Sequence, residues 1–294
     1  MISIPAVVMP VFQGQQDYDD TMATLARSSI PSTVFVVDDG STPPLEVREV
    51  NPAVRIRLIR FDRNRGIVAA LNAGLEAAIA AKHRYIARID AGDYAARDRL
   101  ARQIDYLEKH PRCMLVGSDS IVRDEDGMYR FTIEPPRDPR ALAHGLHERA
   151  WLLHPGVMYR AEVFEDVGFY SNEFPAAEDY EMFLRIARRH EIGVVPEPLL
   201  EYVTRTRSIS ARKARTQAIS RLRIQARYFR WNRWICYYGM MRTIGTIILP
   251  DRIKQSMKLK FLYSRRLLNE DRANEDRANE DGAPSRLQSR AQSS

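Results

Sequence analysis

The stretch Val34-Phe35-Val36-Val37-Asp38-Asp39-Gly40-Ser41 is one of two in which an apolar strand runs directly into acidic residues and a glycine. The other is Tyr85-Ile86-Ala87-Arg88-Ile89-Asp90-Ala91-Gly92-Asp93. In an open α/β sheet, ligands bind beyond the carboxyl ends of the strands. Carboxylates at that edge, with glycine beside them, suit a nucleotide and a divalent metal ion. The two stretches therefore predict an enzyme that uses a nucleotide-activated substrate.

Strand-like and helix-like segments alternate around these two stretches. Helices of 10–15 residues between apolar strands predict an α/β fold with a mostly parallel sheet flanked by helices. The strands are expected at residues 6–11, 34–37, 54–60, 85–89, 113–118 and 156–159, and the helices at 16–29, 66–81, 97–109 and 179–189.

The 294 residues are enough for one large α/β domain with appendages. Residues 1–202 carry 24 Lys and Arg against 31 Asp and Glu, whereas residues 203–267 carry 17 against one acid, Asp251. We therefore expect a globular domain over residues 1–210 and a basic, aromatic-rich helical segment over residues 211–267. A disordered tail with repeats of Asn-Glu-Asp-Arg-Ala is expected over residues 268–294.

Two cysteines without a CxxC pair fit a reducing cytoplasm, and the N-terminus has no basic region typical of a secretory signal. The expected location is thus cytoplasmic.

The acids at the two strand ends each have two interpretations. Asp38 or Asp39 accepts a hydrogen bond from a base or ribose, or forms an Asx turn or helix cap. Asp90 and Asp93 hold Mg²⁺ or Mn²⁺, which prefer carboxylate ligands and stabilise a departing diphosphate. Alternatively, Asp93 caps the helix that follows.

Two predicted helix starts carry further candidates. Asn64, Arg65 and Gly66 open an alanine-rich helix whose free N–H groups suit a phosphate or ribose, or serve as a cap with close packing. Glu178 and Asp179 open the helix over 179–189. The helix dipole favours the ionised form of Asp179, which then takes a proton from an attacking hydroxyl, or only caps the helix.

Three more residues are weaker candidates. His154, in His154-Pro155-Gly156, lines an acceptor site or contacts phosphate, or is a structural histidine. Arg205 and Arg207 reach the diphosphate, because the guanidinium fork suits phosphate, or they begin the basic surface.

The order of these motifs resembles the family 2 glycosyltransferases, which have the GT-A fold. The resemblance covers about residues 4–210. It rests on Met9-Pro10-Val11-Phe12-Gln13, Val37-Asp38-Asp39-Gly40-Ser41, Asn64-Arg65-Gly66 through Gly74, His154–Arg160 and Ala177-Glu178-Asp179-Tyr180.

The resemblance implies the following roles. The nucleotide-sugar site would comprise Pro10, Val11, Phe12, Asp38, Asp39, Asn64, Arg65, Asp90 and Ala91. Within it, Asp39 would accept from the base and Asp90 would contact the ribose or donor sugar. Asp93, with Asp90, would bind the metal, and Asp179, with Glu178 beside it, would be the general base. The implied reaction is a single displacement with inversion, using a nucleoside-diphosphate sugar that is a UDP-sugar by family analogy.

One position departs from the family pattern. The metal motif is usually Asp-x-Asp-Asp, and its third position is Gly92 here. Three explanations are open: Asp93 reaches the cation, the phosphates coordinate it, or Arg205 and Arg207 neutralise the phosphate instead.

The basic segment predicts a partner. Its most apolar window, 235–250, is shorter than the roughly 20 residues that a spanning helix needs. An interfacial helix on an anionic membrane fits better, with the enzyme peripheral on the inner face of the cell membrane. The acceptor would be a saccharide or lipid-linked hydroxyl in bacterial surface polysaccharide synthesis. Alternatively, these helices only pack on the domain.

Two other functions compete with the enzyme: a nucleic-acid-binding protein and an inactive nucleotide-sugar-binding scaffold. No nucleic acid is expected, because nucleic-acid binding leaves the acid-tipped strands unexplained.

Overall fold

The computed structural model describes residues 4–204 and 214–248. Arg205, Arg207, the end of the basic segment and the repeat-containing tail lie outside these residues. Contacts divide the chain into two units, residues 1–244 and residues 245–294. Of the second unit, only the last four residues of one helix are described.

The strands form one mixed sheet in the order β3-β2-β1-β4-β8-β6-β9-β5, with β7 paired to β6. They are β1 (Ala6–Val11), β2 (Ser32–Asp38), β3 (Val54–Arg60), β4 (Tyr85–Arg88), β5 (Tyr94–Ala95), β6 (Cys113–Asp124), β7 (Tyr129–Ile133), β8 (Met158–Arg160) and β9 (Glu191–Thr204). Strands β3, β2, β1 and β4 are mutually parallel, as are β6 and β9. The short β8 lies antiparallel between β4 and β6.

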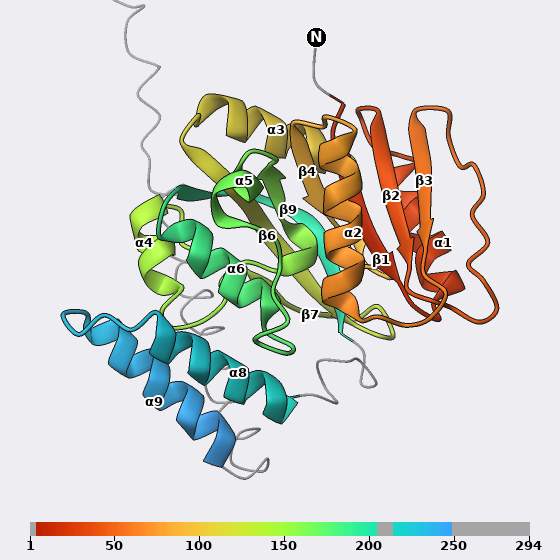
Figure 1. The fold of residues 1–294 in the computed structure, drawn as a ribbon. Coiled ribbons are helices and arrows are strands. Elements are labelled where there is room, and N and C mark those ends of the chain that lie inside the picture. The colour runs from red at the N-terminus through yellow and green to blue at the C-terminus, as the bar shows by residue number, and fades with distance from the viewer. Residues whose placement is uncertain (1–3, 205–213, 249–294) are drawn as a thin grey trace, which may run out of the picture. The chain divides into compact units, whose positions relative to one another are not determined.

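Helices cover both faces of the sheet (Figure 1). They are α1 (Gln15–Leu25), α2 (Ile67–Ala80), α3 (Arg99–Lys109), α4 (Pro139–Gly145), α5 (Val163–Val167), α6 (Glu178–Ala187), α8 (Ala214–Arg227) and α9 (Trp234–Ile248), with a 3₁₀ turn η1 (His154–Gly156).

Successive side chains of β1 belong to two different hydrophobic cores, one on each face of the sheet, and each core contains different helices. Val8 packs with residues of α2, α5 and α6, whereas Val7 and Met9 pack with residues of α1 and α3. Successive side chains of a strand point to opposite faces, so a strand that is apolar throughout buries both.

The expected fold class, a mostly parallel sheet flanked by helices, is confirmed. The expected strand 113–118 is longer, since β6 continues to Asp124. The long strand β9 and the β6–β7 hairpin have no counterpart among the expected elements. In β9, Pro196 and Pro198 interrupt the strand pattern, and they stand where the β6–β9 register shifts.

The parallel register brings the acid-tipped ends together. Val11 of β1 lies opposite Asp38 of β2, and Val8 lies opposite Arg88 of β4. Helix α2 runs close beside β1, because a Cβ on Gly74 would lie 2.5 Å from Val8 Cγ1. The loops after β1, β2 and β4 therefore meet at one edge of the sheet.

Gly40 joins the loop after β2 to the loop before α2. Its φ is +76°, and a Cβ there would overlap the carbonyl carbon of Arg63. Both the backbone conformation and the close approach of two chain segments require glycine at this position.

We predict that Gly40→Ala destabilises the fold by about 2–5 kcal/mol, because positive φ costs about 1–2 kcal/mol and the clash adds about 1–3 kcal/mol. Gly127→Ala is the matched control, since Gly127 has a φ of +78° but no atom within 4 Å of the position that a Cβ would take. Urea denaturation of both variants measures the difference. Equal losses of unfolding free energy would show that the contact with Arg63 has no effect.

Candidate functional site

The exposed end of β1 opens the site. Pro10 and Val11 are buried in the strand, whereas Phe12, just beyond it, is 49% exposed. The backbone N–H of Gln13 donates to Ser41 Oγ at 3.0 Å, which ties this loop to the loop after β2. An exposed aromatic ring at a strand end is suited to stacking on a base, and contact of Phe12 with a nucleotide stays a prediction.

Asp38 is fully buried and organises the turn after β2. Its carboxylate accepts from the N–H groups of Ser41 at 2.9 Å and Leu45 at 3.2 Å, and it lies 3.4 Å from the guanidinium of Arg60. This is the turn geometry of the alternative interpretation. Contact of Asp38 with a nucleotide stays a prediction.

Asp39 holds the start of α2. Its two carboxylate oxygens accept from the N–H groups of Arg65 at 2.6 Å and Gly66 at 2.9 Å. The carboxylate thus caps a helix N-terminus from a separate strand, which stabilises both the free N–H groups and the charge. A hydrogen bond from a base to Asp39 stays a prediction.

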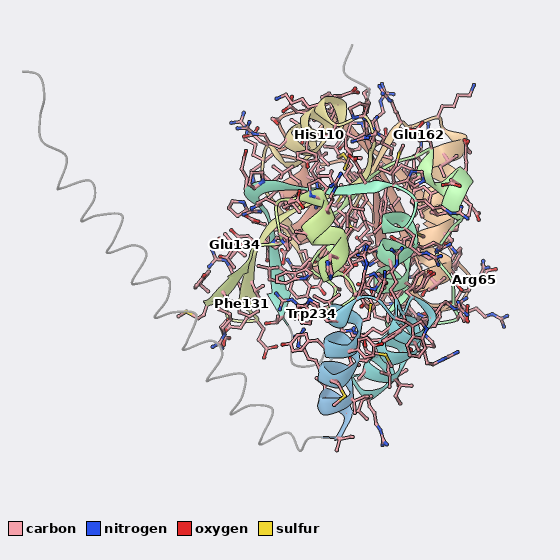
Figure 2. All side chains as sticks on the ribbon, turned by 90° about the vertical axis from the view of Figure 1, so that its left-hand side faces the viewer. Arg65, His110, Phe131, Glu134, Glu162 and Trp234 are labelled. Atoms are coloured by element: carbon pink, nitrogen blue, oxygen red, sulfur yellow. The ribbon has the colours of Figure 1, made fainter. Side chains whose placement is uncertain are left out.

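The loop fixed by Asp39 presents polar groups to solvent. Asn64 and Arg65 are exposed, and the Arg65 guanidinium lies 4.4 Å from the centroid of the Phe61 ring. Figure 2 labels Arg65 at the surface of the molecule. Both residues lie at the sheet edge where a ligand was expected.

Arg88 is a site residue that the sequence analysis did not identify. Its side chain is 6% exposed and forms an ion pair through Nη2 with Oδ1 of Asp90, whose side chain is 38% exposed. The two residues are two apart on one strand end, so they share a face. An arginine within an otherwise apolar strand was the available signal, because a buried guanidinium needs a charged partner.

Asp93 lies deeper, with 3% of its surface exposed. Its Oδ1 accepts from the Val203 N–H at 3.2 Å, and its carbonyl accepts from Thr21 Oγ1 at 2.9 Å. Asp93 therefore fastens the end of β9 to the turn after β4. Ala91, partly exposed, lies between Asp90 and Gly92 in this turn.

These residues do not fit a divalent metal ion. Asp90 is already paired with Arg88, Asp93 is enclosed and bonded to Val203, and position 92 holds no acid. Residues 4–204 and 214–248 contain no group of three or more His, Cys, Asp or Glu side chains arranged to hold a metal. We therefore assign no catalytic step to a metal.

Glu178 and Asp179 begin α6, as predicted. Burial and the neighbouring charge of Asp179 raise the pKa of Glu178 to about 7. Burial also raises the pKa of Asp179, although the Tyr180 N–H, at 2.7 Å from its Oδ1, and the charge of Arg88 lower it. Desolvation of Asp179 therefore outweighs the effect of the helix dipole on its pKa, and the ionised form of Asp179 at neutral pH stays a prediction.

A pocket of about 150 Å³ lies beside Glu178. It lies between Gly66, Ile67 and Val68 at the start of α2 and the 172–178 loop, and Glu178 lines it. The start of α2, which follows Asn64 and Arg65, and Glu178 thus border one cavity.

His154 lies beneath the site in a buried chain of hydrogen bonds. Its Nε2 is 2.7 Å from the hydroxyl of Tyr170, which is 2.7 Å from the hydroxyl of Tyr159. Burial lowers the pKa of His154 well below its ordinary value, so the imidazole is neutral. This geometry is that of the structural histidine, and contact with an acceptor stays a prediction.

Solved structures share this fold. The first 349 residues of TarS from S. aureus superpose with a TM-score of 0.60 at 14% identity, covering 83% of this chain and 72% of that one. A second TarS structure contains UDP-GlcNAc and gives a TM-score of 0.57. The mannosyltransferase PcManGT from Pyrobaculum calidifontis, in complex with GDP-Man and Mn²⁺, gives 0.58 at 16% identity, covering 88% and 80%.

The sequence comparisons also identify glycosyltransferases as relatives. The amylovoran biosynthesis glycosyltransferase AmsE of Erwinia amylovora is 28% identical over 219 residues, which are 71% of this chain and 76% of AmsE. The profile described as Glycosyl transferase family 2 matches residues 6–168, more than half of the chain. The chain therefore belongs to glycosyl transferase family 2 and has the GT-A fold.

Proposed function

We propose that the chain is an inverting glycosyltransferase that moves a sugar from a UDP-sugar to a hydroxyl of a saccharide or lipid-linked acceptor. The proposed setting is bacterial surface polysaccharide synthesis. AmsE, whose name assigns it to amylovoran biosynthesis, supports the setting, and the TarS complex with UDP-GlcNAc supports the donor.

One observation carries this proposal. Glu178 at the start of α6 and Gly66, which follows the nucleotide candidates Asn64 and Arg65, line the same pocket, and the charges of Arg88 and Asp90 act on Glu178. A base and a donor site must both lie within reach of the same acceptor hydroxyl if the hydroxyl is to be deprotonated as it attacks.

In the proposed reaction, the acceptor hydroxyl gives its proton to the Asp179 carboxylate and its oxygen attacks the anomeric carbon. The bond between that carbon and the diphosphate oxygen breaks, and the nucleoside diphosphate leaves with the electron pair. Attack opposite the leaving group inverts the anomeric configuration. A raised pKa makes Asp179 a stronger base than an ordinary aspartate, since the best catalytic pKa lies near the working pH.

The C-terminal helices supply the proposed membrane contact. On and just before α9, Trp231 is 81% exposed, Trp234 69% and Met241 67%, and Arg230 is also exposed beside them. Figure 2 shows Trp234 at the surface on α9. Within the described residues no helix is long and apolar enough to cross a bilayer. Exposed aromatics beside arginines fit an anionic membrane surface.

We predict that Asp179→Asn lowers the rate of sugar transfer by about 10²–10⁴-fold, the usual contribution of a general base. Its affinity for UDP stays within about threefold, because Asp179 contacts the acceptor and not the nucleotide. Single-turnover transfer assays and calorimetry measure the two effects. Asp105→Asn, an exposed acid on α3, is the control and retains full transfer. Full transfer by Asp179→Asn would refute the base assignment.

We predict that kcat/KM rises with pH as Asp179 loses its proton, and that this rise lies above the pKa of an ordinary aspartate, because burial raises the pKa of Asp179. Burial and the charge of Asp179 raise the pKa of Glu178 to about 7, so Asp179 ionises first and Glu178 is still protonated when the base forms. Glu178→Gln resembles this protonated form and should leave the rising limb in place. A rate profile between pH 4 and 9 measures both enzymes. A wild-type profile that is flat over this range would contradict the assignment.

We predict that Trp231→Ala with Trp234→Ala lowers binding of the full chain to anionic vesicles by about tenfold or more per tryptophan, because burial of an aromatic side chain contributes about 1.5–3 kcal/mol. Co-sedimentation measures it. The control is Met128→Ala with Tyr129→Ala, which removes two side chains that are 65% and 58% exposed on the β6–β7 hairpin. Equal vesicle binding by both double variants would contradict the membrane assignment.

A further inference from the structure

The charge environment of Asp90 differs from that of a free metal ligand. The guanidinium that pairs with it belongs to Arg88, which is almost fully enclosed. Within the described part of the chain, Nε and Nη1 of Arg88 find no hydrogen-bond partner, so Asp90 is the side chain paired with this buried cation, and the charge of Asp93 also acts on it. A buried guanidinium deprived of its carboxylate is strongly unfavourable.

A second arginine lies directly behind the first. Arg99 is 1% exposed, and its Nη2 donates to the carbonyl oxygen of Arg88 at 2.6 Å. Burial and the charge of Arg88 lower the pKa of Arg99 to about 9, while the charge of Asp93 raises it, so Arg99 remains protonated at neutral pH. Two guanidinium groups thus face two carboxylates, Asp90 and Asp93, and this cluster has no net charge.

The turn that carries these acids is built around glycine. Gly92 has a φ of +92°, and its N–H donates to Asp17 O at 3.0 Å and to Thr21 Oγ1 at 2.8 Å. A side chain at position 92 would need a backbone conformation that non-glycine residues rarely adopt. The turn is therefore fixed in a form that lacks a third acid.

A cation at Asp90 would bind the same carboxylate that pairs with Arg88. A divalent ion would either separate the pair, leaving a buried guanidinium uncompensated, or stand beside that guanidinium and be repelled by it. In a metal-binding carboxylate motif, the cation supplies positive charge to the carboxylates. At Asp90, the Arg88 guanidinium already supplies a positive charge.

We propose that the Arg88 guanidinium takes the place of the divalent cation at Asp90, so that this chain binds its nucleoside-diphosphate donor without a metal. The inference rests on the proposed nucleotide-sugar function and names the residue that neutralises its donor site. Arg88 acts through Asp90 as a positioning residue: it fixes the carboxylate orientation and balances its charge.

The test is a calorimetric titration of the full chain with UDP, GDP and dTDP, in EDTA and in Mn²⁺. For the wild type we expect one of the nucleotides to bind with dissociation constants within threefold in the two conditions. Wild-type binding that is tenfold or more tighter in Mn²⁺ would overturn the inference and leave the proposed function standing. No binding of any nucleotide in either condition would overturn both.

Arg88→Met provides the reciprocal test, because it releases Asp90 and leaves the site one positive charge short. We expect its nucleotide binding to fall tenfold or more in EDTA and to be largely restored by Mn²⁺, with Mn²⁺ binding also visible by electron paramagnetic resonance. Binding by Arg88→Met as tight as the wild type in EDTA would overturn the inference.

Arg84→Met is the matched control, since Arg84 is an exposed arginine just before the same strand and pairs with Glu108. It should behave as the wild type in both buffers. Arg88→Lys retains a cation and should keep metal-independent binding. If circular dichroism shows that Arg88→Met is unfolded, the comparison of wild type in EDTA and Mn²⁺ and the Arg88→Lys variant decide the question.

Discussion

The burial of two guanidinium groups, those of Arg88 and Arg99, constrains the whole donor edge of this protein. A buried charge is unfavourable unless an opposite charge or hydrogen bonds compensate it. Arg99 on α3 donates to the backbone of β4, and Gln103, one turn along, donates to Gly156 O at 2.8 Å. Helix α3, strand β4 and the turn η1 are therefore joined by polar contacts beneath the site.

The same requirement extends to the ends of other strands. Asp93, which contributes to the electrostatic balance of both arginines, receives the N–H of Val203 near the end of β9. The exit of β9 is thus tied to the turn that presents Asp90. A substitution in this cluster would change both the stability of the fold and the geometry of the donor site. Charge-conserving and isosteric variants are therefore more informative there than alanine variants.

Much of the nucleotide edge was predictable because its signals are local. An apolar strand that ends in Asp-Asp-Gly-Ser or Asp-Ala-Gly-Asp indicates both the strand end and the acids, and a glycine-opened, alanine-rich run indicates α2. The catalytic roles of these acids depended on the family resemblance, because a turn or cap explains the same residues equally well. The structure shows the turn and cap geometry for Asp38 and Asp39.

Other features have little local signal. Strand β8 overlaps the strand expected at residues 156–159, but it is three residues long and pairs between strands that are distant in sequence. Strand β9 contains two prolines, which weaken any strand prediction. The pairing of Arg88 with Asp90 and the raised pKa of Asp179 both depend on how much protein surrounds a charge, a property of the assembled fold. Sequence spacing places these residues at strand and helix ends but carries no information about their desolvation.

The packing of α8 gives the proposed membrane face a physical connection to the base. The Tyr228 hydroxyl, immediately after α8, donates to Glu181 Oε1 at 2.6 Å in a buried contact, and Glu181 lies two residues beyond Asp179 on α6. Arg227 also pairs with Glu173 in the loop that precedes α6. On the other side, a Cβ on Gly239 of α9 would overlap the carbonyl oxygen of His147, so α9 approaches the backbone after α4 closely.

Buried polar contacts and close backbone packing resist relative motion more than exposed ion pairs do. A surface that docks on lipid through α9 would therefore hold α6, and the carboxylates at its start, in a fixed orientation to the membrane. That orientation would matter for an acceptor that is itself confined to the membrane, as the proposed lipid-linked acceptor is.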